Sequence, residues 1–460
     1  MSSSSIAATR PWWAQKRWWI AITLCAVTMI GYVDRLALAV AAPVIRREFA
    51  FTNEQYGLIT LAFLLSYALG QLLLGPVIDR LGSKRSLSLA VLWWSVASML
   101  HAFGRSVGGF FAARAFLGIT EAANFPAAYK VVAEWFPRAE RSFASGFITA
   151  GTGIGAIVAP PLIAFLIGSF DTLHAVGLSP VQGWQAAFIV PGVLGFAWVW
   201  LWNRRFHLPE SHPSIDPAER ALVLGDRTAV LAAVRPKRGS IIDETTAYFR
   251  RLAYWFRYRQ TWGLALARFA GDGAFYFFAF WIPNYLNDVR GFGLKEIAWA
   301  AAIPFIFADA GSLIGGWTGQ RLIRGGLSVD ASRKLMIWSG ALLVPLALPA
   351  VYVDSPVLAV LCMGLGIFAL QVKSASLFAV PADLFPAGAV GTVWGASGAA
   401  GSLAAAFSQP VIGWTIDKYS YEPVFIVVSM MHIVSATLVM VLIRRIEPVA
   451  LKPGVVSSAI

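Results

Sequence analysis

Long apolar segments alternate with short polar ones along almost the whole chain. A helix needs about 20 mainly apolar residues to cross a bilayer, and twelve segments reach or approach that length. They cover residues 18–42, 55–76, 86–103, 108–134, 142–169, 185–203, 260–286, 295–320, 335–353, 356–382, 389–416 and 423–443. Barrel strands are shorter, and helices satisfy their own backbone groups where water is absent. The pattern predicts an all-α polytopic membrane protein with twelve transmembrane helices.

The twelve segments fall into two sets of six around a polar, proline-containing stretch at 204–259. This organisation predicts an N-terminal six-helix bundle at 1–203, a cytoplasmic linker at 204–259, a C-terminal bundle at 260–445 and a cytoplasmic tail at 446–460. The aromatic and basic end of the linker is interpreted as a solvated tether with interfacial anchors, or as an amphipathic interfacial helix. Paired six-helix halves are typical of transporters, with the substrate site between them near mid-membrane.

Composition agrees with a membrane protein: 58% of the residues are hydrophobic and 13% are charged, against roughly 25% charged in soluble domains. The net charge is +13, and 26 of the 37 Lys and Arg fall in the segments predicted to be cytoplasmic. Such asymmetry is the positive-inside signature. It predicts cytoplasmic termini in a bacterial inner membrane and excludes nucleic-acid binding as the reason for the charge. The polar start, Met1–Lys16, leads directly into the first segment and has no cleavage-site pattern.

The sequence does not indicate a disulfide, a metal or cofactor site, an enzyme or a sensor. Cys25 and Cys362 fall inside predicted spans in opposite halves, so we expect no disulfide. No spacing of His, Cys and carboxylates indicates a metal, and no cofactor is expected. An enzyme or sensor would need a nucleophile–base constellation or an added soluble domain, and the loops contain neither.

Charged residues inside the apolar segments are the main functional signal. Asp34 and Arg35 lie in the first segment, and Arg114 and Glu121 lie in the fourth. A charge at mid-membrane costs roughly 2.5–3.5 kcal/mol, so these residues are expected to bind and couple a charged cargo. The alternative is that they are structural ion pairs between helices.

Spacing adds to this interpretation. Seven residues are about two helical turns, so Arg114 and Glu121 share a face but lie roughly 10 Å apart along the axis. Each therefore needs another partner, and Asp34 or Arg35 is the candidate if the first and fourth spans are adjacent. An arginine fork binds both oxygens of a carboxylate, whereas burial favours the protonated form of an acid such as Glu121. The set predicts an anion site with a proton carrier beside it.

A glycine-containing motif follows the second span. Its fixed positions are Gly75, Asp79, Arg80, Gly82, Lys84 and Arg85. Gly75 permits close helix approach, Gly82 allows a tight turn, and Asp79 can bind the N-terminus of a neighbouring helix as a cytoplasmic latch. A similar motif recurs at Gly316–Gly326, where Gln320 replaces the acid, and at Gly413–Asp417. The pattern resembles the signature of the major facilitator superfamily.

Longer stretches narrow the resemblance. YVDR at Tyr32–Arg35 and ARAFLGITEAANFPAAYKVVAEWFPRAER at Ala113–Arg141 resemble the anion:cation symporter branch. Stretches similar to the hexuronate transporters within it are Gly151–Leu162, Gly316–Val329, Leu377–Gly395 and Gln409–Trp414. The resemblance implies that Arg35 binds the substrate carboxylate and that Asp34 and Glu121 carry protons. The chain departs from the family pattern at three positions. Gly153 stands where Asn is usual, Lys373 where Trp is usual, and Ser376 where Asn is usual.

Other polar residues complete the candidate site. Tyr32 and Tyr67 are expected to donate hydrogen bonds to a sugar acid, with packing as the alternative of equal weight. Asn124 lies one turn after Glu121, near Pro126, so the fourth span is predicted to be irregular. Thr152 is expected to face it from the fifth span.

The second half carries charges of its own. Arg268 and Asp272 are four residues apart and are expected to neutralise each other. Lys373 has no acid at helical spacing. Its charge is predicted to meet Asp309 or an anionic group of the cargo, and with Ser376 it is assigned to the substrate site.

The sequence therefore predicts a monomeric, proton-coupled symporter of a carboxylated sugar or similar small organic anion. The alternatives are a transporter of an aromatic or dicarboxylic acid, and an anion exchanger.

Overall fold

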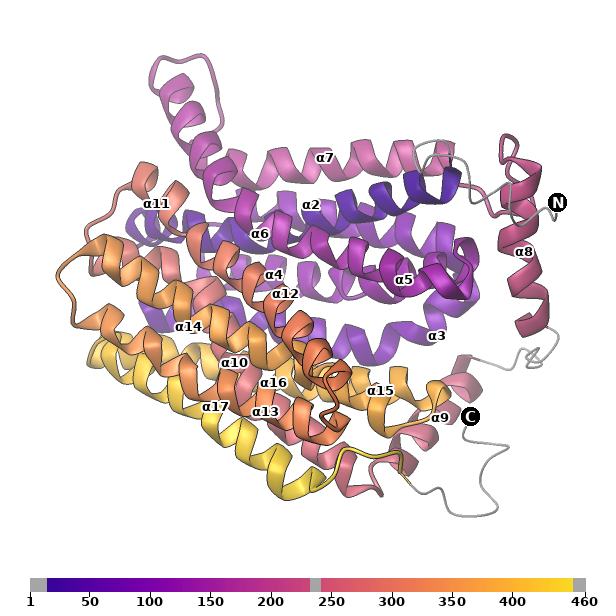
Figure 1. The fold of residues 1–460 in the computed structure, drawn as a ribbon. Coiled ribbons are helices and arrows are strands. Elements are labelled where there is room, and N and C mark those ends of the chain that lie inside the picture. The colour runs from indigo at the N-terminus through magenta and orange to yellow at the C-terminus, as the bar shows by residue number, and fades with distance from the viewer. Residues whose placement is uncertain (1–14, 232–240, 450–460) are drawn as a thin grey trace.

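The computed structural model describes residues 15–231 and 241–449. Its described part contains helices and no strand, and the long helices run side by side as one bundle (Figure 1). The prediction of an all-α membrane protein is confirmed. The polar segment before Gln15, residues 232–240 of the linker and residues 450–460 of the tail lie outside the described residues.

The six spans before the linker are all helical. They are α2 (Lys16–Phe49), α3 (Asn53–Leu100, two spans), the turn η2 (His101–Phe103), α4 (Val107–Glu121) with α5 (Asn124–Trp135), α6 (Arg138–Ala175) and α7 (Gly183–Arg205). Side-chain caps are found at the starts of α3 and α4, among others. Thr52 forms a capping box with Gln55 at α3, and the Ser106 hydroxyl accepts from the Gly109 N–H at α4. Such caps satisfy backbone donors that the first turn leaves unpaired.

The second set of six follows the linker. It consists of α10 (Arg259–Asp288), α11 (Leu294–Ala300) with α12 (Ile303–Arg324), α13 (Val329–Leu343) with the turn η3 (Val344–Val351), α14 (Pro356–Leu377), α15 (Val380–Leu384), α16 (Ala387–Lys418) and α17 (Glu422–Ile443). Nine segments of the described chain are long and apolar enough to cross a membrane on their own. The broken fourth span, α10 and α16 complete the twelve. Figure 1 shows α2–α7 on one side of the bundle and α10–α17 on the other.

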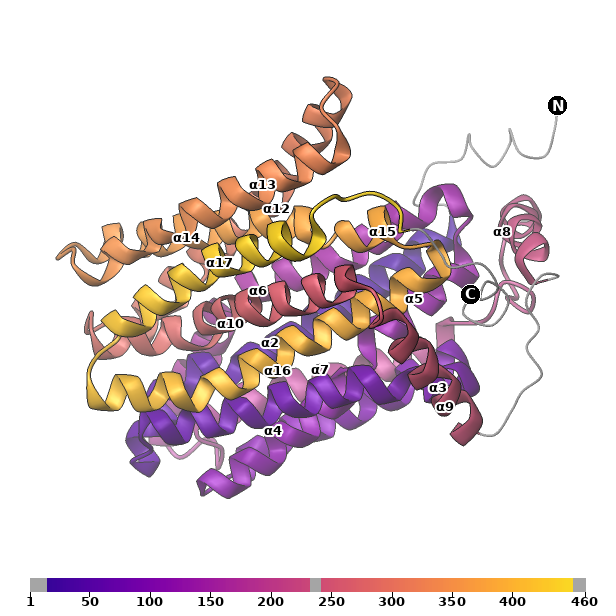
Figure 2. The same ribbon diagram turned by 90° about the horizontal axis from the view of Figure 1, so that it is seen from below.

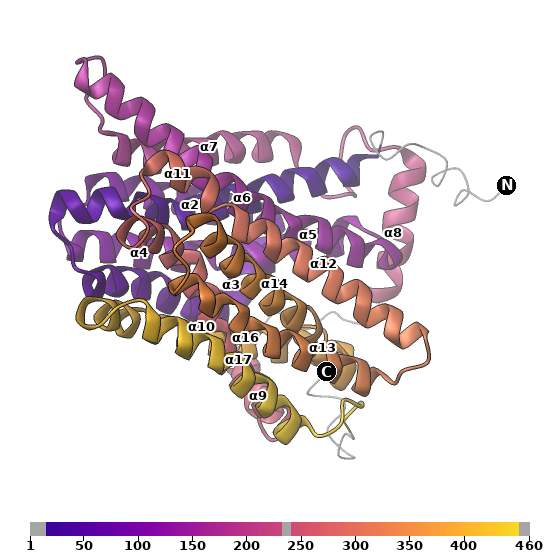
Figure 3. The ribbon, with the colours of Figure 1, turned by 60° about the vertical axis from the view of Figure 1, so that its left-hand side comes forward.

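Small residues let helices approach closely within and between these sets, as in other membrane bundles. A Cβ on Gly118 of α4 would lie 2.3 Å from the Phe63 carbonyl oxygen of α3. A Cβ on Gly311 of α12 would lie equally close, 2.3 Å, to the Phe368 carbonyl oxygen of α14. Figure 3 shows α11 beside α6, which is one of the contacts that join the two halves.

The linker contains two helices, α8 (Pro217–Leu231) and α9 (Ile241–Trp255). Both lie at the end of the bundle where α2 begins and α17 ends (Figure 1). We call this the proximal end, and the opposite end the distal end. Arg17 of α2 fixes the start of α8, because its guanidinium pairs with Glu219 (3.2 Å) as well as with Glu140 of α6 (2.8 Å).

The second linker helix lies across the proximal end. α9 contacts α3 of the first half and α16 of the second (Figure 2). Its last residue, Trp255, is buried with its ring centroid 5.5 Å from that of Phe385. The aromatic end of the linker is therefore a helix packed on both halves.

Candidate functional site

The guanidinium of Arg35 lies in an aromatic enclosure inside the first half. Its Cζ atom is 4.7 Å from the ring centroid of Tyr32, 5.0 Å from that of Phe63 and 4.7 Å from that of Tyr67. Arg35 is only 4% exposed. Cation–π attraction strengthens when water is excluded, so these rings hold the cation without neutralising it. Phe63 carries no polar group, and sequence reasoning had not assigned it to the site.

Glu121 supplies the neutralising charge from the fourth span. Its Oε1 accepts from Arg35 Nε at 3.1 Å and from a terminal nitrogen of Arg35 at 2.5 Å. Both side chains are about 95% buried, and Glu121 Oε2 has no hydrogen-bond partner in the part of the chain that the structure describes. A buried ion pair gives up much hydration energy, and loss of one partner leaves a costly unpaired charge. The expectation that the first and fourth spans are adjacent is confirmed at this pair.

The fourth span is broken beside the pair. α4 ends at Glu121 and α5 begins at Asn124. Pro126 has no N–H to continue the ladder, which explains the local break and confirms the predicted irregularity. Asn124 donates to the Thr28 hydroxyl of α2 at 3.3 Å. The break therefore points both Glu121 and Asn124 at the first span.

The other two mid-membrane charges have partners that the sequence did not indicate. Both terminal nitrogens of Arg114 donate to the backbone carbonyl of Arg35, each at 3.1 Å. Asp34 accepts from the Ser98 hydroxyl of α3 at 2.6 Å. Arg114 thus holds the backbone of Arg35 rather than an acid, which corrects the expectation that it pairs with a side chain of the first span.

Among the described residues, no hydrogen bond joins Thr152 to this cluster, and its role in the site stays a prediction. Its hydroxyl donates to the Thr149 carbonyl of its own helix at 2.7 Å. The neighbouring Gly153, by contrast, contacts the second half, because a Cβ there would lie 2.1 Å from Asp309 Oδ2 of α12.

In the second half, Arg268 and Asp272 neutralise each other as predicted. Arg268 Nε donates to Asp272 Oδ2 at 2.9 Å, and a second nitrogen lies 2.8 Å from the same oxygen. The guanidinium also lies over the rings of Phe378 (4.7 Å) and Trp394 (5.2 Å). Both charges of this pair come from one helix.

Lys373 points into the interior of the second half. Its ammonium donates to Ser435 Oγ at 2.6 Å and lies 3.1 Å from His432 Nδ1, both on α17. Among the described residues it has neither Asp309 nor the Arg35 cluster as a polar partner. Ser376 is buried one turn away, and its Oγ lies 3.7 Å from a Cβ position on Gly319 of α12. Among the described residues, no hydrogen bond or ion pair joins Lys373 or Ser376 to the Arg35 cluster, and their place in the substrate site stays a prediction.

The proximal glycine motif forms the turn that the sequence predicted. Gly82 has φ 77° and ψ 164° and separates the two legs of α3. On this turn Ser83 donates to Glu134 of α5 at 2.5 Å. No described atom comes within 4 Å of a Cβ position on Gly75, so the expected close helix approach is not seen there. The side chain of Asp79 lies outside the described residues, and the latch role of Asp79, Arg80, Lys84 and Arg85 stays a prediction.

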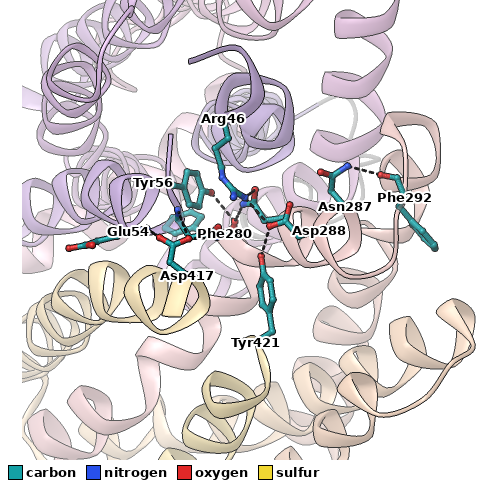
Figure 4. Close-up of polar contacts among 11 residues, drawn as sticks. Arg46, Glu54, Tyr56, Phe280, Asn287, Asp288, Phe292, Asp417 and Tyr421 are labelled. Carbon is teal, nitrogen blue, oxygen red and sulfur yellow. Dashed lines mark hydrogen bonds and ion pairs between the residues drawn. The ribbon is translucent and has the colours of Figure 1, made fainter. Parts of the chain in front are cut away.

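Contacts of the kind predicted for Asp79 occur at the distal end, where Asp417 meets the start of α3 (Figure 4). The backbone N–H groups of Asn53 and Glu54 donate to the Asp417 carboxylate at 3.1 and 2.8 Å, and Asn53 Nδ2 donates at 2.8 Å. Carboxylates are stabilised at a helix N-terminus by its free N–H groups and dipole. The third occurrence of the glycine motif, at Gly413–Asp417, therefore joins the two halves.

A second set of distal contacts centres on Asp288, at the end of α10. Arg46 of α2 lies 2.9 Å from Asp288 Oδ2 and 3.2 Å from Asn284 Oδ1, and the Tyr421 hydroxyl donates to the same Asp288 oxygen at 3.1 Å. Arg46 and Tyr421 converge on Asp288 in Figure 4. Tyr56 of α3 adds a hydrogen bond to the Phe280 carbonyl at 2.8 Å. The distal ends of the two halves are therefore linked by polar contacts that sequence reasoning missed.

In the part of the chain that the structure describes, no group of three or more His, Cys, Asp or Glu residues is arranged to hold a metal ion. A family model described as "Major Facilitator Superfamily" matches residues 24–408. The chain belongs to this superfamily. It is a multi-pass membrane transporter and not an enzyme.

Relatives within the major facilitator superfamily confirm the resemblance to sugar-acid transporters. The chain is 31% identical over 433 residues to the hexuronate transporter of Escherichia coli strain K12, covering 93% of this chain and 94% of that one. It is 33% identical over 333 residues to the galacturonate transporter of Dickeya chrysanthemi, covering 71% and 89%.

A solved structure agrees on the fold. A bacterial homologue of the human lysosomal transporter Spinster, in an inward-facing and occupied conformation, matches with a TM-score of 0.70 and 16% identity, covering 92% and 95% of the two chains.

Proposed function

We propose that this transporter carries a carboxylated sugar, a hexuronate or aldonate, together with protons by alternating access. It would act as a monomer in a bacterial inner membrane with both termini in the cytoplasm, and residues 204–259 would link bundles at 1–203 and 260–445. The names of the hexuronate and galacturonate relatives support the substrate class. The observation that carries the proposal is the Arg35–Glu121 ion pair inside a ring of aromatic side chains.

The pair supports a competition between substrate and acid. The Arg35 fork can bind two carboxylate oxygens, but one terminal nitrogen and Nε are occupied by Glu121. A proton on Glu121 removes its charge and releases the guanidinium for a substrate carboxylate. When the substrate leaves, the deprotonated acid returns to Arg35. Proton loading and substrate loading are then tied to one cation.

The surrounding residues suit a sugar acid. The rings of Tyr32 and Tyr67 lie beside Arg35 and offer flat apolar faces to the sugar. Their hydroxyls can exchange hydrogen bonds with sugar hydroxyls. Arg114 keeps the Arg35 backbone in place through the carbonyl. Asp34, held by Ser98, provides a second acid for proton coupling.

Transport by the purified protein in proteoliposomes tests the proposal. We expect labelled galacturonate or galactonate to accumulate only under an inward proton gradient, and uptake to fall as external pH rises because fewer protons are available. Equal uptake without a proton gradient, with sodium substituting fully, would contradict proton coupling. Preferred uptake of aromatic acids would contradict the substrate class, and strict one-for-one exchange would identify an anion exchanger.

A further inference from the structure

Asp309 is a charged side chain that the proposed mechanism does not use. It lies at the midpoint of the apolar segment Leu294–Arg324, which is long enough to cross the membrane. The side chain is half-buried. Among the described residues it has no hydrogen-bond or ion-pair partner. An acid at this depth is costly, so its presence calls for a ligand or a function.

The acid projects across the interface between the two halves. A Cβ on Gly153 of α6 would lie 2.1 Å from Asp309 Oδ2 and 2.4 Å from Oδ1. Any other residue at position 153 would therefore displace the carboxylate. The glycine at this position, which departs from the family pattern, makes room for the carboxylate of the opposite half directly on the α6 backbone.

This placement puts Asp309 on the Tyr32 side of the Arg35 cluster. α6 packs against α2, which carries Tyr32, and against α12, which carries Asp309. The Asp309 carboxylate is within electrostatic range of the Tyr32 hydroxyl, and the Tyr32 ring contacts the Arg35 guanidinium. A ligand held at Arg35 that extends past Tyr32 thus meets an acid of the second half.

The neighbouring charges leave the negative charge of Asp309 uncompensated. Arg268 is neutralised by Asp272 on its own helix. Lys373 is directed at His432 and Ser435, and Arg35 is bound to Glu121. None of these three cations therefore faces Asp309.

We propose that Asp309 selects sugar acids with one carboxylate over those with two. This inference rests on the proposed function. Carboxylate oxygens only accept hydrogen bonds, so Asp309 can bind the hydroxyls of a uronate or aldonate whose single carboxylate lies at Arg35. The second carboxylate of an aldarate would approach the same acid, and juxtaposed like charges are strongly unfavourable.

The test compares binding of a monoanion and a dianion that differ little elsewhere. Affinities for galacturonate, galactonate and galactarate are measured by calorimetry on the purified full-length protein. Wild type should prefer galacturonate and galactonate. In Asp309→Asn the affinity ratio should shift toward galactarate by about tenfold or more, because a like charge has been removed.

Two further variants make the result specific. Gly153→Ala keeps the acid but displaces it, so the ratio should shift in the same direction. Asp330→Asn removes one negative charge from α13, where Asp330 pairs with Lys334, and should leave the ratio unchanged. Thermal unfolding shows whether each variant is folded, and Asp309→Ser replaces Asp309→Asn if that variant is not.

The outcomes separate the two proposals. Binding of sugar acids by wild type with an unchanged ratio in folded Asp309→Asn, or in Asp309→Ser where it replaces that variant, would overturn the selectivity role alone. No binding of any sugar acid by wild type would overturn the proposed function and this inference with it.

Discussion

Glu121 binds the guanidinium of Arg35 through a single oxygen, at 2.5 and 3.1 Å from two nitrogens, and its other oxygen has no hydrogen-bond partner among the described residues. The arrangement is asymmetric: the cation is engaged while half of the carboxylate remains unsatisfied. A buried polar atom without a partner costs free energy, so the pair is less stable than a two-pronged one would be. Such a pair is well suited to being exchanged for a substrate carboxylate.

Replacement of Glu121 by glutamine should separate exchange from accumulation. Glu121→Gln is permanently neutral and resembles the protonated carrier, so we expect loss of concentrative uptake with retention of labelled-for-unlabelled exchange. Both are measured in proteoliposomes. If exchange is lost as well in a folded variant, Glu121 has a role in binding or folding instead of proton coupling.

Arg35→Lys should lose most substrate binding. A point ammonium cannot reproduce bidentate carboxylate recognition, and a hydrogen bond to a charged group is worth about 1.5–3 kcal/mol. Calorimetry should therefore show a drop in affinity of roughly 10- to 150-fold. Wild-type affinity in this variant would show that another residue binds the substrate carboxylate, with Arg114 as the next candidate.

The Asp417 contact should favour closure of the distal end. Asp417→Asn weakens a charge–dipole interaction worth about 0.3–1 kcal/mol, and up to ~2 kcal/mol when partly buried. We expect a larger population with separated distal ends. Spin labels at the exposed Arg47 and Ser420, in a background with both native cysteines replaced by serine, measure this distance.

Glu54, whose backbone takes part in the contact, offers a matched control for that experiment. Glu54→Gln removes an exposed negative charge but keeps the backbone N–H that donates to Asp417. Its distance distribution should equal that of the parent. An unchanged distribution in Asp417→Asn would show that the contact does not control the distal end.

Gly82→Ala should destabilise the protein, because φ 77° with ψ 164° is a region that glycine alone adopts readily. The expected loss is about 1–3 kcal/mol, seen as earlier thermal unfolding in detergent. Gly75→Ala is the control: no described atom lies within 4 Å of its Cβ position, so its unfolding temperature should stay near that of wild type. Equal stability of both variants would argue against strain at Gly82.

Lys373 should tolerate a neutral side chain of similar length but not a large ring. Lys373→Met removes the charge and fits the space beside His432 and Ser435, so we expect folded protein with an unchanged substrate profile. Lys373→Trp overfills a site where Gly271 already comes close to the ammonium, at a cost of about 1–3 kcal/mol. A changed substrate profile in Lys373→Met would show that Lys373 belongs to the substrate site.

The fold was predictable because length and hydropathy alone define membrane-spanning helices, and the glycine turn at Gly82 follows from its motif. The Arg35–Glu121 pair was also within reach, since charges buried in apolar segments must meet partners. The direction in which each side chain points was not. Arg114 facing a carbonyl, Lys373 facing α17 and Asp309 facing Gly153 depend on helix rotation and on contacts between distant segments, which spacing on one helix does not encode.

Each mid-membrane ion pair is contained within one half of the molecule: Arg35 with Glu121 in the first, and Arg268 with Asp272 in the second. In the proposed alternating-access cycle, rocking of the halves would separate neither of these two pairs in the interior, where separating charges that lie 4 Å apart costs about 4 kcal/mol against ~1 kcal/mol in water. Among the described residues, the ion pair between the halves that such a movement would break is Arg46–Asp288, whose side chains are 16% and 29% exposed at the distal rim. The electrostatic barrier to rocking is thus located where solvent can replace the lost partner.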